Sequence, residues 1–150
     1  MRKGWPSKVS GSKMRRRSGW PAKSMPYKHS FGPFAPEVYR APMSYPFREP
    51  VPISGFEAAE RAIGILDKQV GAATLAAVVI EPIQGEGGDN HFRPEYLQAL
   101  RDRADKHEFL LIFDEVQSGM GMSGEWWAWQ SLGVAPDIFC FGKKSQMCGI

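Results

Sequence analysis

Residues 109–115, FLLIFDE, form a short apolar run that ends in two carboxylates. A similar run, LAAVVIEP, occupies residues 75–82, and a third, DIFCFGK, occupies residues 137–143. Continuous apolar runs of this length are typical of strands that are buried on both faces of a parallel sheet. The three runs therefore predict three strands of one sheet, each of which ends in polar residues.

Between these strands the apolar residues recur with helical spacing. Ser54 can cap a helix that ends near Gly71, and further helices are expected over residues 93–108 and 124–133. The side chains expected to face inward are Phe56, Ala59, Ile63, Leu66 and Val70 in the first helix, and Tyr96, Leu97, Leu100 and Ala104 in the second. Alternating helices and strands with short connections predict an α/β fold, mainly a parallel sheet with flanking helices.

The N-terminal part has a different composition from the rest. Residues 1–28 carry nine Lys and Arg side chains and no acid. We expect residues 1–24 to be a basic, disordered tail, although a transit peptide or an upstream start on a truncated gene would also fit. Nucleic-acid binding would depend on residues 2–17 alone, and we do not expect it.

Several protein classes are disfavoured by composition. No apolar run approaches the length of a membrane span, and no apolar segment follows the basic N-terminus as in a secretory signal. The two cysteines, Cys140 and Cys148, cannot build a disulfide framework, and no Cys and His spacing suits a metal such as zinc. We therefore expect a reduced, cytoplasmic protein that has no metal site.

The glycines Gly119, Gly121 and Gly124 match the Gly-x-Gly-x-x-Gly pattern of dinucleotide-binding loops. In those folds the first glycine follows the strand almost at once, and an acid ends the next strand. Here DEVQS separates the apolar run from Gly119, and Asp137 begins the next strand instead of ending it. The dinucleotide interpretation is therefore disfavoured.

Polar clusters follow all three predicted strands: EPIQGEGG at 81–88, DEVQ at 114–117 and GKK at 142–144. Ligands of open α/β sheets gather at the carboxyl ends of the strands, so these clusters are expected to meet at one edge. Each could singly be structural, but a lysine together with a buried carboxylate suggests pyridoxal phosphate. Because Asp114 and Glu115 are neighbours on a strand, they should point to opposite faces.

At these residues the sequence resembles the class III, pyridoxal-phosphate-dependent aminotransferases. The motifs AAVVIEPIQGEGG, LLIFDEVQSGMG and PDIFCFGKK occur in the order and spacing of that family. The resemblance covers roughly residues 20–150, about a third of a family chain. It implies that residues 25–150 are part of the cofactor-binding large domain of a fold-type I enzyme, truncated at both ends, whose full-length parent is a homodimer.

The resemblance also implies roles for individual residues. Asp114 would pair with the pyridinium nitrogen, Val116 would pack against the ring, and Gln117 would hydrogen-bond the phenolic oxygen. Lys143 would form the Schiff base with pyridoxal 5'-phosphate and later move the proton of the substrate. Glu86 resembles the glutamate of ω-aminotransferases that alternately pairs with and releases an arginine.

Lys144 would then be only the neighbour of the Schiff-base lysine. The family lysine directly follows Gly or Ser, as Lys143 follows Gly142. Because successive side chains of a strand alternate, we expect Lys144 to face away from Lys143.

The resemblance implies transfer of a terminal amine to 2-oxoglutarate. The segment from residue 22 to 48 is similar to 4-aminobutyrate aminotransferases, whereas the motifs WWAWQSLGVAPDI and FGKKSQMCG are closer to L-lysine 6-aminotransferase. We favour the L-lysine ε-amine as the donor, with 4-aminobutyrate as the alternative. We expect the truncated chain itself to be inactive, and it could be a non-catalytic remnant of either enzyme.

Overall fold

The computed structural model describes residues 36–49 and 51–150. The chain divides into two compact units, Met1–Arg40 and Ala41–Ile150, and the fold presented below is that of the second unit. The tail expected over residues 1–24 lies outside the described residues.

Helix α2 spans Gly55–Gln69 and is capped by Ser54, as predicted. The Ser54 Oγ accepts a hydrogen bond from the Glu57 backbone N–H at 3.1 Å, and the Glu57 carboxylate accepts one from the Ser54 N–H at 2.7 Å. This reciprocal pair satisfies two backbone donors that have no partner within the helix. Two side chains that were predicted to face inward are not buried. Val70, at the C-terminal end of the helix, is half-buried. Phe56 is 57% exposed because it lies in the first turn, beside an open groove of about 440 Å³ that Pro94 also lines.

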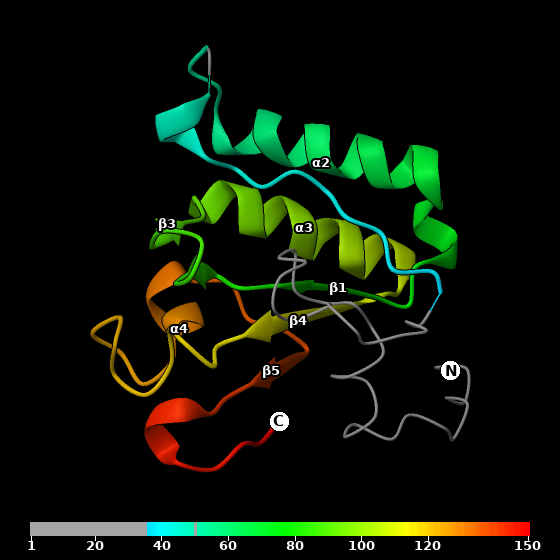
Figure 1. The fold of residues 1–150 in the computed structure, drawn as a ribbon. Coiled ribbons are helices and arrows are strands. Elements are labelled where there is room, and N and C mark those ends of the chain that lie inside the picture. The colour runs from blue at the N-terminus through cyan, green and yellow to red at the C-terminus, as the bar shows by residue number, and fades with distance from the viewer. Residues whose placement is uncertain (1–35, 50) are drawn as a thin grey trace, which may run out of the picture. The chain divides into compact units, whose positions relative to one another are not determined.

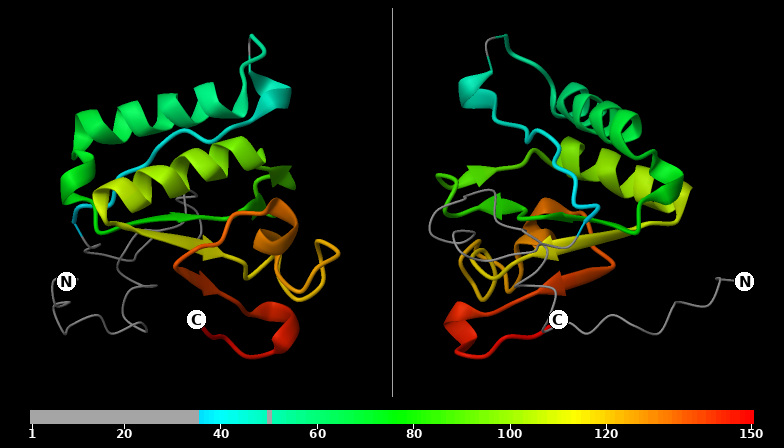
Figure 2. Two further views of the ribbon diagram at one scale, coloured as in Figure 1. Left: turned by 180° about the vertical axis from the view of Figure 1, so that it is seen from behind. Right: turned by 45° about the vertical axis from the view of Figure 1, so that its right-hand side comes forward.

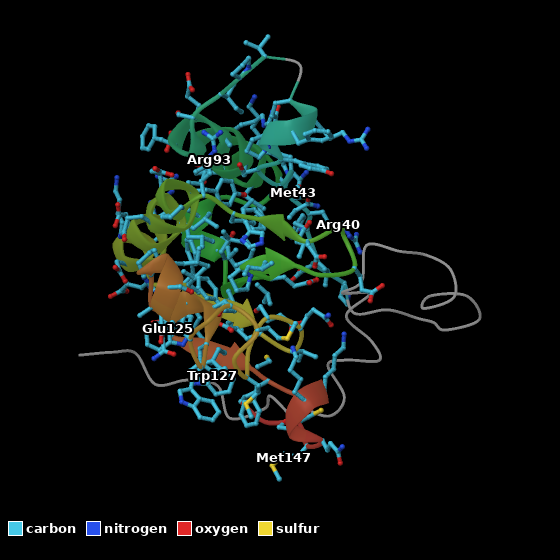
Figure 3. The ribbon with its side chains drawn as sticks, turned by 90° about the vertical axis from the view of Figure 1, so that its left-hand side faces the viewer. Arg40, Met43, Arg93, Glu125, Trp127 and Met147 are labelled. Atoms are coloured by element: carbon cyan, nitrogen blue, oxygen red, sulfur yellow. The ribbon has the colours of Figure 1, made fainter. Side chains whose placement is uncertain are left out.

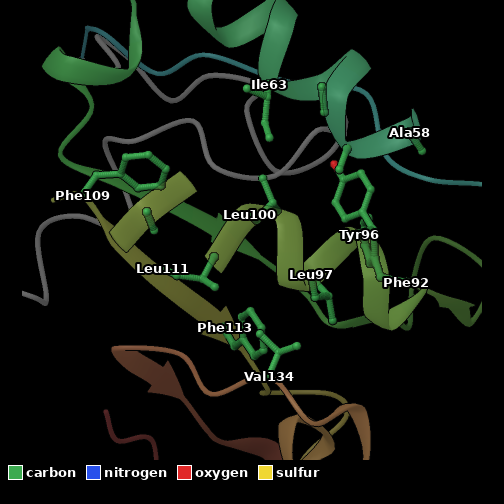
Figure 4. Packing of buried hydrophobic residues seen from close by; sticks show 13 residues of the cluster. Ala58, Ile63, Phe92, Tyr96, Leu97, Leu100, Phe109, Leu111, Phe113 and Val134 are labelled. Carbon is green, nitrogen blue, oxygen red and sulfur yellow. The ribbon is translucent and has the colours of Figure 1, made fainter. Parts of the chain in front are cut away.

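Helix α3 spans Pro94–His107 and buries the four side chains predicted from its spacing, namely Tyr96, Leu97, Leu100 and Ala104. In Figures 1 and 2, α3 lies between α2 and the sheet. Figure 4 shows Ile63 of α2 above Leu100 of α3, and Leu97 above the strand residue Phe113. The helix therefore contributes to both interfaces of the core.

The sheet contains β1 (Ala77–Ile80), β4 (Leu110–Asp114) and β5 (Ile138–Cys140), in the order β1-β4-β5 with all strands parallel. The predicted parallel α/β architecture is confirmed. Burial on both faces was predicted wrongly for all three strands: the residues of β1 and β5 are only half-buried, and those of β4 alternate between buried and half-buried. The reason is that α2 and α3 lie on the same side of the sheet (Figure 2).

The third predicted helix is shorter than expected. Helix α4 spans only Ala128–Leu132, because residues 119–127 form a loop that closes on itself. A small antiparallel hairpin of β2 (Ile83–Gln84) and β3 (Asn90–His91) was not predicted. Three short 3-10 turns complete the described elements: η1 (Pro46–Arg48), η2 (Ala72–Thr74) and η3 (Lys143–Ser145). None of the helices in the described part of the chain has the length and apolarity to cross a membrane.

Candidate functional site at the carboxyl edge of the sheet

The polar clusters that follow β1, β4 and β5 meet at one edge of the sheet. The Lys143 Nζ, after β5, donates a hydrogen bond to the Gln117 side-chain oxygen, after β4. Gln117 in turn lies against Gly85, which belongs to the polar cluster 81–88 and directly follows β2. A Cβ atom on Gly85 would be only 2.3 Å from the Gln117 Cγ. Glycine is therefore required at position 85 for this contact. The predicted convergence of the three clusters is observed.

Asp114 is the last residue of β4 and is half-buried. Its Oδ1 accepts a hydrogen bond from the Val116 backbone N–H at 3.1 Å. Its Oδ2 accepts none from the residues that the structure describes. The carboxylate is thus held by its own turn, with one oxygen available to a donor from a ligand.

Glu115 has a different environment, and its side chain is only 1% exposed. Its carboxylate accepts hydrogen bonds from the backbone N–H groups of Ala128 at 2.7 Å and Trp129 at 2.9 Å, at the start of α4. The Ser118 hydroxyl is 3.3 Å away. Because these backbone donors have no partner inside the helix, the carboxylate fixes α4 to the end of β4.

The two lysines do not face apart, so the prediction from strand alternation was wrong. Strand β5 ends at Cys140, and Lys143 lies in η3 with a left-handed φ of 53°. The Lys144 Nζ donates to the backbone oxygens of Gln117 at 2.7 Å and Gly119 at 3.5 Å. Both amines therefore reach the segment after β4, but Lys144 binds backbone carbonyls whereas Lys143 contacts a side chain.

Val116 and Glu86 occupy the borders of this arrangement. The Val116 Cγ1 lies 3.7 Å from the position that a Cβ atom on Gly142 would take, so Val116 packs next to the residue before Lys143. Glu86 is exposed in the turn between β2 and β3. The structure thus places Val116 close to the lysine and Glu86 farther toward solvent.

Glu81 was part of a predicted cluster, but no role was predicted for it. Burial and the nearby Asp114 carboxylate raise the pKa of Glu81, while the Gly85 backbone N–H and Lys143 act in the opposite direction. A carboxyl group with a raised pKa at the end of a strand is typical of functional sites. The signal in the sequence was its place directly after the apolar run 75–80.

The Gly-x-Gly-x-x-Gly loop is not arranged to bind a dinucleotide. The Gly119 N–H donates to the backbone carbonyl of Glu115 at 2.9 Å. The N–H groups of Met120 and Gly121 donate to the backbone carbonyl of Trp126 at 2.7 and 3.4 Å. Those donors are occupied by the chain itself and do not point from a helix N-terminus toward a phosphate. Figure 3 shows Trp127, the last residue before α4, on the β5 side of the molecule. In the described residues, no group of three or more His, Cys, Asp and Glu side chains could hold a metal ion.

A parallel α/β sheet with a lysine, an amide and a carboxylate at its carboxyl edge defines a candidate site for a carbonyl cofactor. The profile of the family described as Aminotransferase class-III matches residues 19–149. The chain belongs to this family, whose members are enzymes that depend on pyridoxal phosphate.

Individual relatives carry two names. The chain is 51% identical over 130 residues to the 4-aminobutyrate aminotransferase of Mycobacterium tuberculosis. This match covers 81% of this chain and 29% of the relative. It is 60% identical over 76 residues to the L-lysine-epsilon aminotransferase of the same organism. This second match covers 51% of this chain and 17% of the relative. The solved lysine aminotransferase of Mycobacterium tuberculosis matches with a TM-score of 0.57 and 52% identity, over 63% of this chain and 21% of that one.

Proposed function

We propose that this chain provides part of the cofactor-binding large domain of an ω-aminotransferase that moves a terminal amino group to 2-oxoglutarate. The observation that supports this most is the contact of Lys143 with Gln117 beside Asp114 at the carboxyl edge of the sheet. A lysine amine and a carboxylate are the two groups that pyridoxal phosphate requires from its protein. The chain spans 29% of the length of the 4-aminobutyrate aminotransferases that it matches over 130 residues.

The residues fit the cofactor by their chemistry. The Lys143 amine would bind its aldehyde, the second oxygen of Asp114 would accept a hydrogen bond from its ring nitrogen, and the Gln117 amide would donate to its phenolic oxygen. When bound, pyridoxal phosphate supplies an electron sink for the bonding pair left on the amine-bearing carbon of the substrate.

The protein groups then have separate tasks. Asp114 would keep a proton on the ring nitrogen because a carboxylate favours the charged form of a neighbouring nitrogen. The Lys143 Nζ would take the proton from the amine-bearing carbon of the substrate and return it, as a general base and acid. Val116 would restrict the ring position, and exposed Glu86 would exchange an arginine partner with the incoming dicarboxylate.

The donor is proposed to be L-lysine, through its ε-amine, with 4-aminobutyrate as the alternative. The 60% identity to an L-lysine-epsilon aminotransferase lies over 76 residues, whereas the 51% identity to a 4-aminobutyrate aminotransferase extends over 130 residues. We further propose that the enzyme acts as a homodimer in the cytoplasm. Comparison of both amines as donors, with glutamate formation as the readout, would decide between them.

The assignment of the lysine can be tested by chemical trapping. The purified protein is incubated with pyridoxal phosphate, reduced with borohydride, digested and mapped by mass spectrometry. We expect the pyridoxyl group on Lys143, loss of this label in Lys143→Ala, and its retention in the matched control Lys144→Ala. Label on Lys144 alone, or equal label on both lysines, would contradict the proposal.

The role of Asp114 can be separated from that of its neighbour. Asp114→Asn should abolish most turnover because a neutral amide does not keep the ring nitrogen protonated. Glu115→Gln should affect stability more than turnover per folded molecule, since its carboxylate contacts only the protein. Equal loss of turnover for the two variants, after correction for the folded fraction, would refute this division.

A further inference from the structure

The turn that follows β4 presents two backbone carbonyls to one side chain. The Lys144 Nζ lies 2.7 Å from the Gln117 backbone oxygen and 3.5 Å from that of Gly119, and it donates to both. Within residues 36–49 and 51–150, no backbone N–H donates to either oxygen. Gly119 is buried, and a carbonyl that is removed from water without a donor destabilises the conformation that holds it. Lys144 therefore provides the hydrogen bonds that this turn does not make by itself.

Gln117 is also the residue whose side chain contacts the proposed cofactor lysine. The Lys143 Nζ donates to its side-chain oxygen, and Gly85 lies against its Cγ atom. The side chain of Gln117 is thus held by Lys143, while its backbone is held by Lys144. Two successive lysines bind one glutamine at two points.

The loop that carries both lysines is closed by its own backbone. Phe141 and Gly149 exchange backbone hydrogen bonds of 3.0 and 3.2 Å, and the Gln146 N–H donates to the Lys143 carbonyl at 2.9 Å. The loop therefore has its own hydrogen bonds at its base and in its turn. The ammonium of Lys144 binds outside this loop, so its contribution is to the turn after β4.

We propose that Lys144 is a positioning residue for Gln117: its ammonium fixes the turn after β4, so that the Gln117 amide is held where it meets the cofactor. A hydrogen bond from a charged donor is stronger than one between neutral groups. Because Lys144 is exposed, water competes for its ammonium and limits the size of the effect. The effect on the cofactor rests on the proposed function, whereas the ordering of Gln117 does not.

The ordering of Gln117 is tested by nitrogen NMR relaxation of its backbone and side-chain amides, in the full 150-residue chain without cofactor. In Lys144→Met we expect the order parameters to fall from about 0.85, the rigid range, toward about 0.6. Lys144→Arg should stay near the wild type, because a guanidinium can donate to both carbonyls. The matched control Lys106→Met, at the exposed end of α3, should leave Gln117 unchanged.

Unchanged order parameters of Gln117 in Lys144→Met would overturn the inference. The amide spectra of the variants show whether they are folded. Lys144→Ala is a second variant for which we expect the same fall, so an unchanged value in it is equally contrary to the inference. These measurements need no cofactor, and their result stands whether or not the proposed function is correct.

The effect on the cofactor is tested by the concentration of pyridoxal phosphate that gives half-maximal borohydride label on Lys143. Lys144→Met and Lys144→Ala should need about tenfold more cofactor, although the label at saturation stays on Lys143. Lys144→Arg should remain within about threefold of the wild type, and Lys106→Met within about twofold. In the background of Gln117→Ala, Lys144→Met should change the concentration by less than about twofold, because the group that it positions is absent.

A tenfold effect of Lys144→Met that persists in Gln117→Ala would show that Lys144 does not act through Gln117, and would refute the role. An equal loss in Lys144→Arg and Lys144→Met would also contradict it, since the hydrogen bonds to the carbonyls would then not matter. A wild-type chain that takes up no label would contradict the proposed function, while the relaxation data would still decide whether Lys144 orders Gln117.

Discussion

Replacement of Glu115 by Ala should destabilise the fold strongly although this residue is placed outside the proposed chemistry. Its carboxylate binds the N–H groups of Ala128 and Trp129 at 2.7 and 2.9 Å and is 1% exposed. Hydrogen bonds to charged groups contribute about 1.5–3 kcal/mol each, so the loss of two amounts to about 3–6 kcal/mol. Small domains have a free energy of unfolding of about 5–15 kcal/mol, and a large part of it would be lost.

The assay is urea unfolding of the purified protein, followed by tryptophan fluorescence, because Trp127 and Trp129 flank the contact. Glu115→Gln retains one acceptor and should lose roughly half as much stability as Glu115→Ala. The control Glu125→Ala is exposed and should change the free energy of unfolding by less than about 0.5 kcal/mol. A loss below about 1 kcal/mol in Glu115→Ala would refute the assignment of Glu115 as the anchor of α4.

Three further outcomes are expected. Gly85→Ala should remain folded but reduce borohydride trapping at Lys143 about tenfold, because its Cβ would displace Gln117; undiminished trapping would contradict this. Gly64→Ala has no atom within 4 Å of the added carbon and should stabilise α2 by about 0.5–1 kcal/mol in urea unfolding; destabilisation would contradict the packing described. Burial raises the pKa of Tyr96 to about 12, so stability should be complete below pH 10.0 and fall as the pH rises to about 12. Tyr96→Phe should abolish this alkaline loss, which thermal unfolding at several pH values would show, at a cost of about 1 kcal/mol for the hydrogen bond to Pro42.

The long elements could be predicted from the sequence because their patterns repeat. The second predicted helix has the inward residues expected from its spacing, since α3 contacts α2 on one side and β4 on the other. Phe56 follows the same spacing, but it lies in the first turn of α2 and is exposed. The spacing of apolar residues along one helix does not show where the neighbouring helix begins. The extent of α4 was overestimated for a similar reason. GEWW has the composition of a helix, but its backbone closes a turn on Met120.

The site was predicted in its residues but not in its geometry. The apolar runs show where each strand ends, so the convergence of Asp114, Gln117 and Lys143 follows from the parallel topology. The direction of Lys143 does not follow, because two residues separate it from β5 and its positive φ reverses the chain. The electrostatic interaction of Glu81 with Asp114 does not follow from the sequence either, because the two residues come after the last paired row of β1 and β4, and a single sequence does not contain this register.

The turn between α3 and β4 closes at Glu108, whose φ is 58°, at the edge of the sheet opposite the proposed site. This separation has a consequence for insertions and deletions. Extra residues near Glu108 would lengthen a distant turn and leave the order of side chains along β4 intact. Deletion of one residue within Leu110–Asp114 would instead exchange the faces of the side chains that follow. Glu115 would then stand beside Glu81, and α4 would lose its anchor. Length variation among homologous chains should therefore accumulate near Glu108 and be absent from β4.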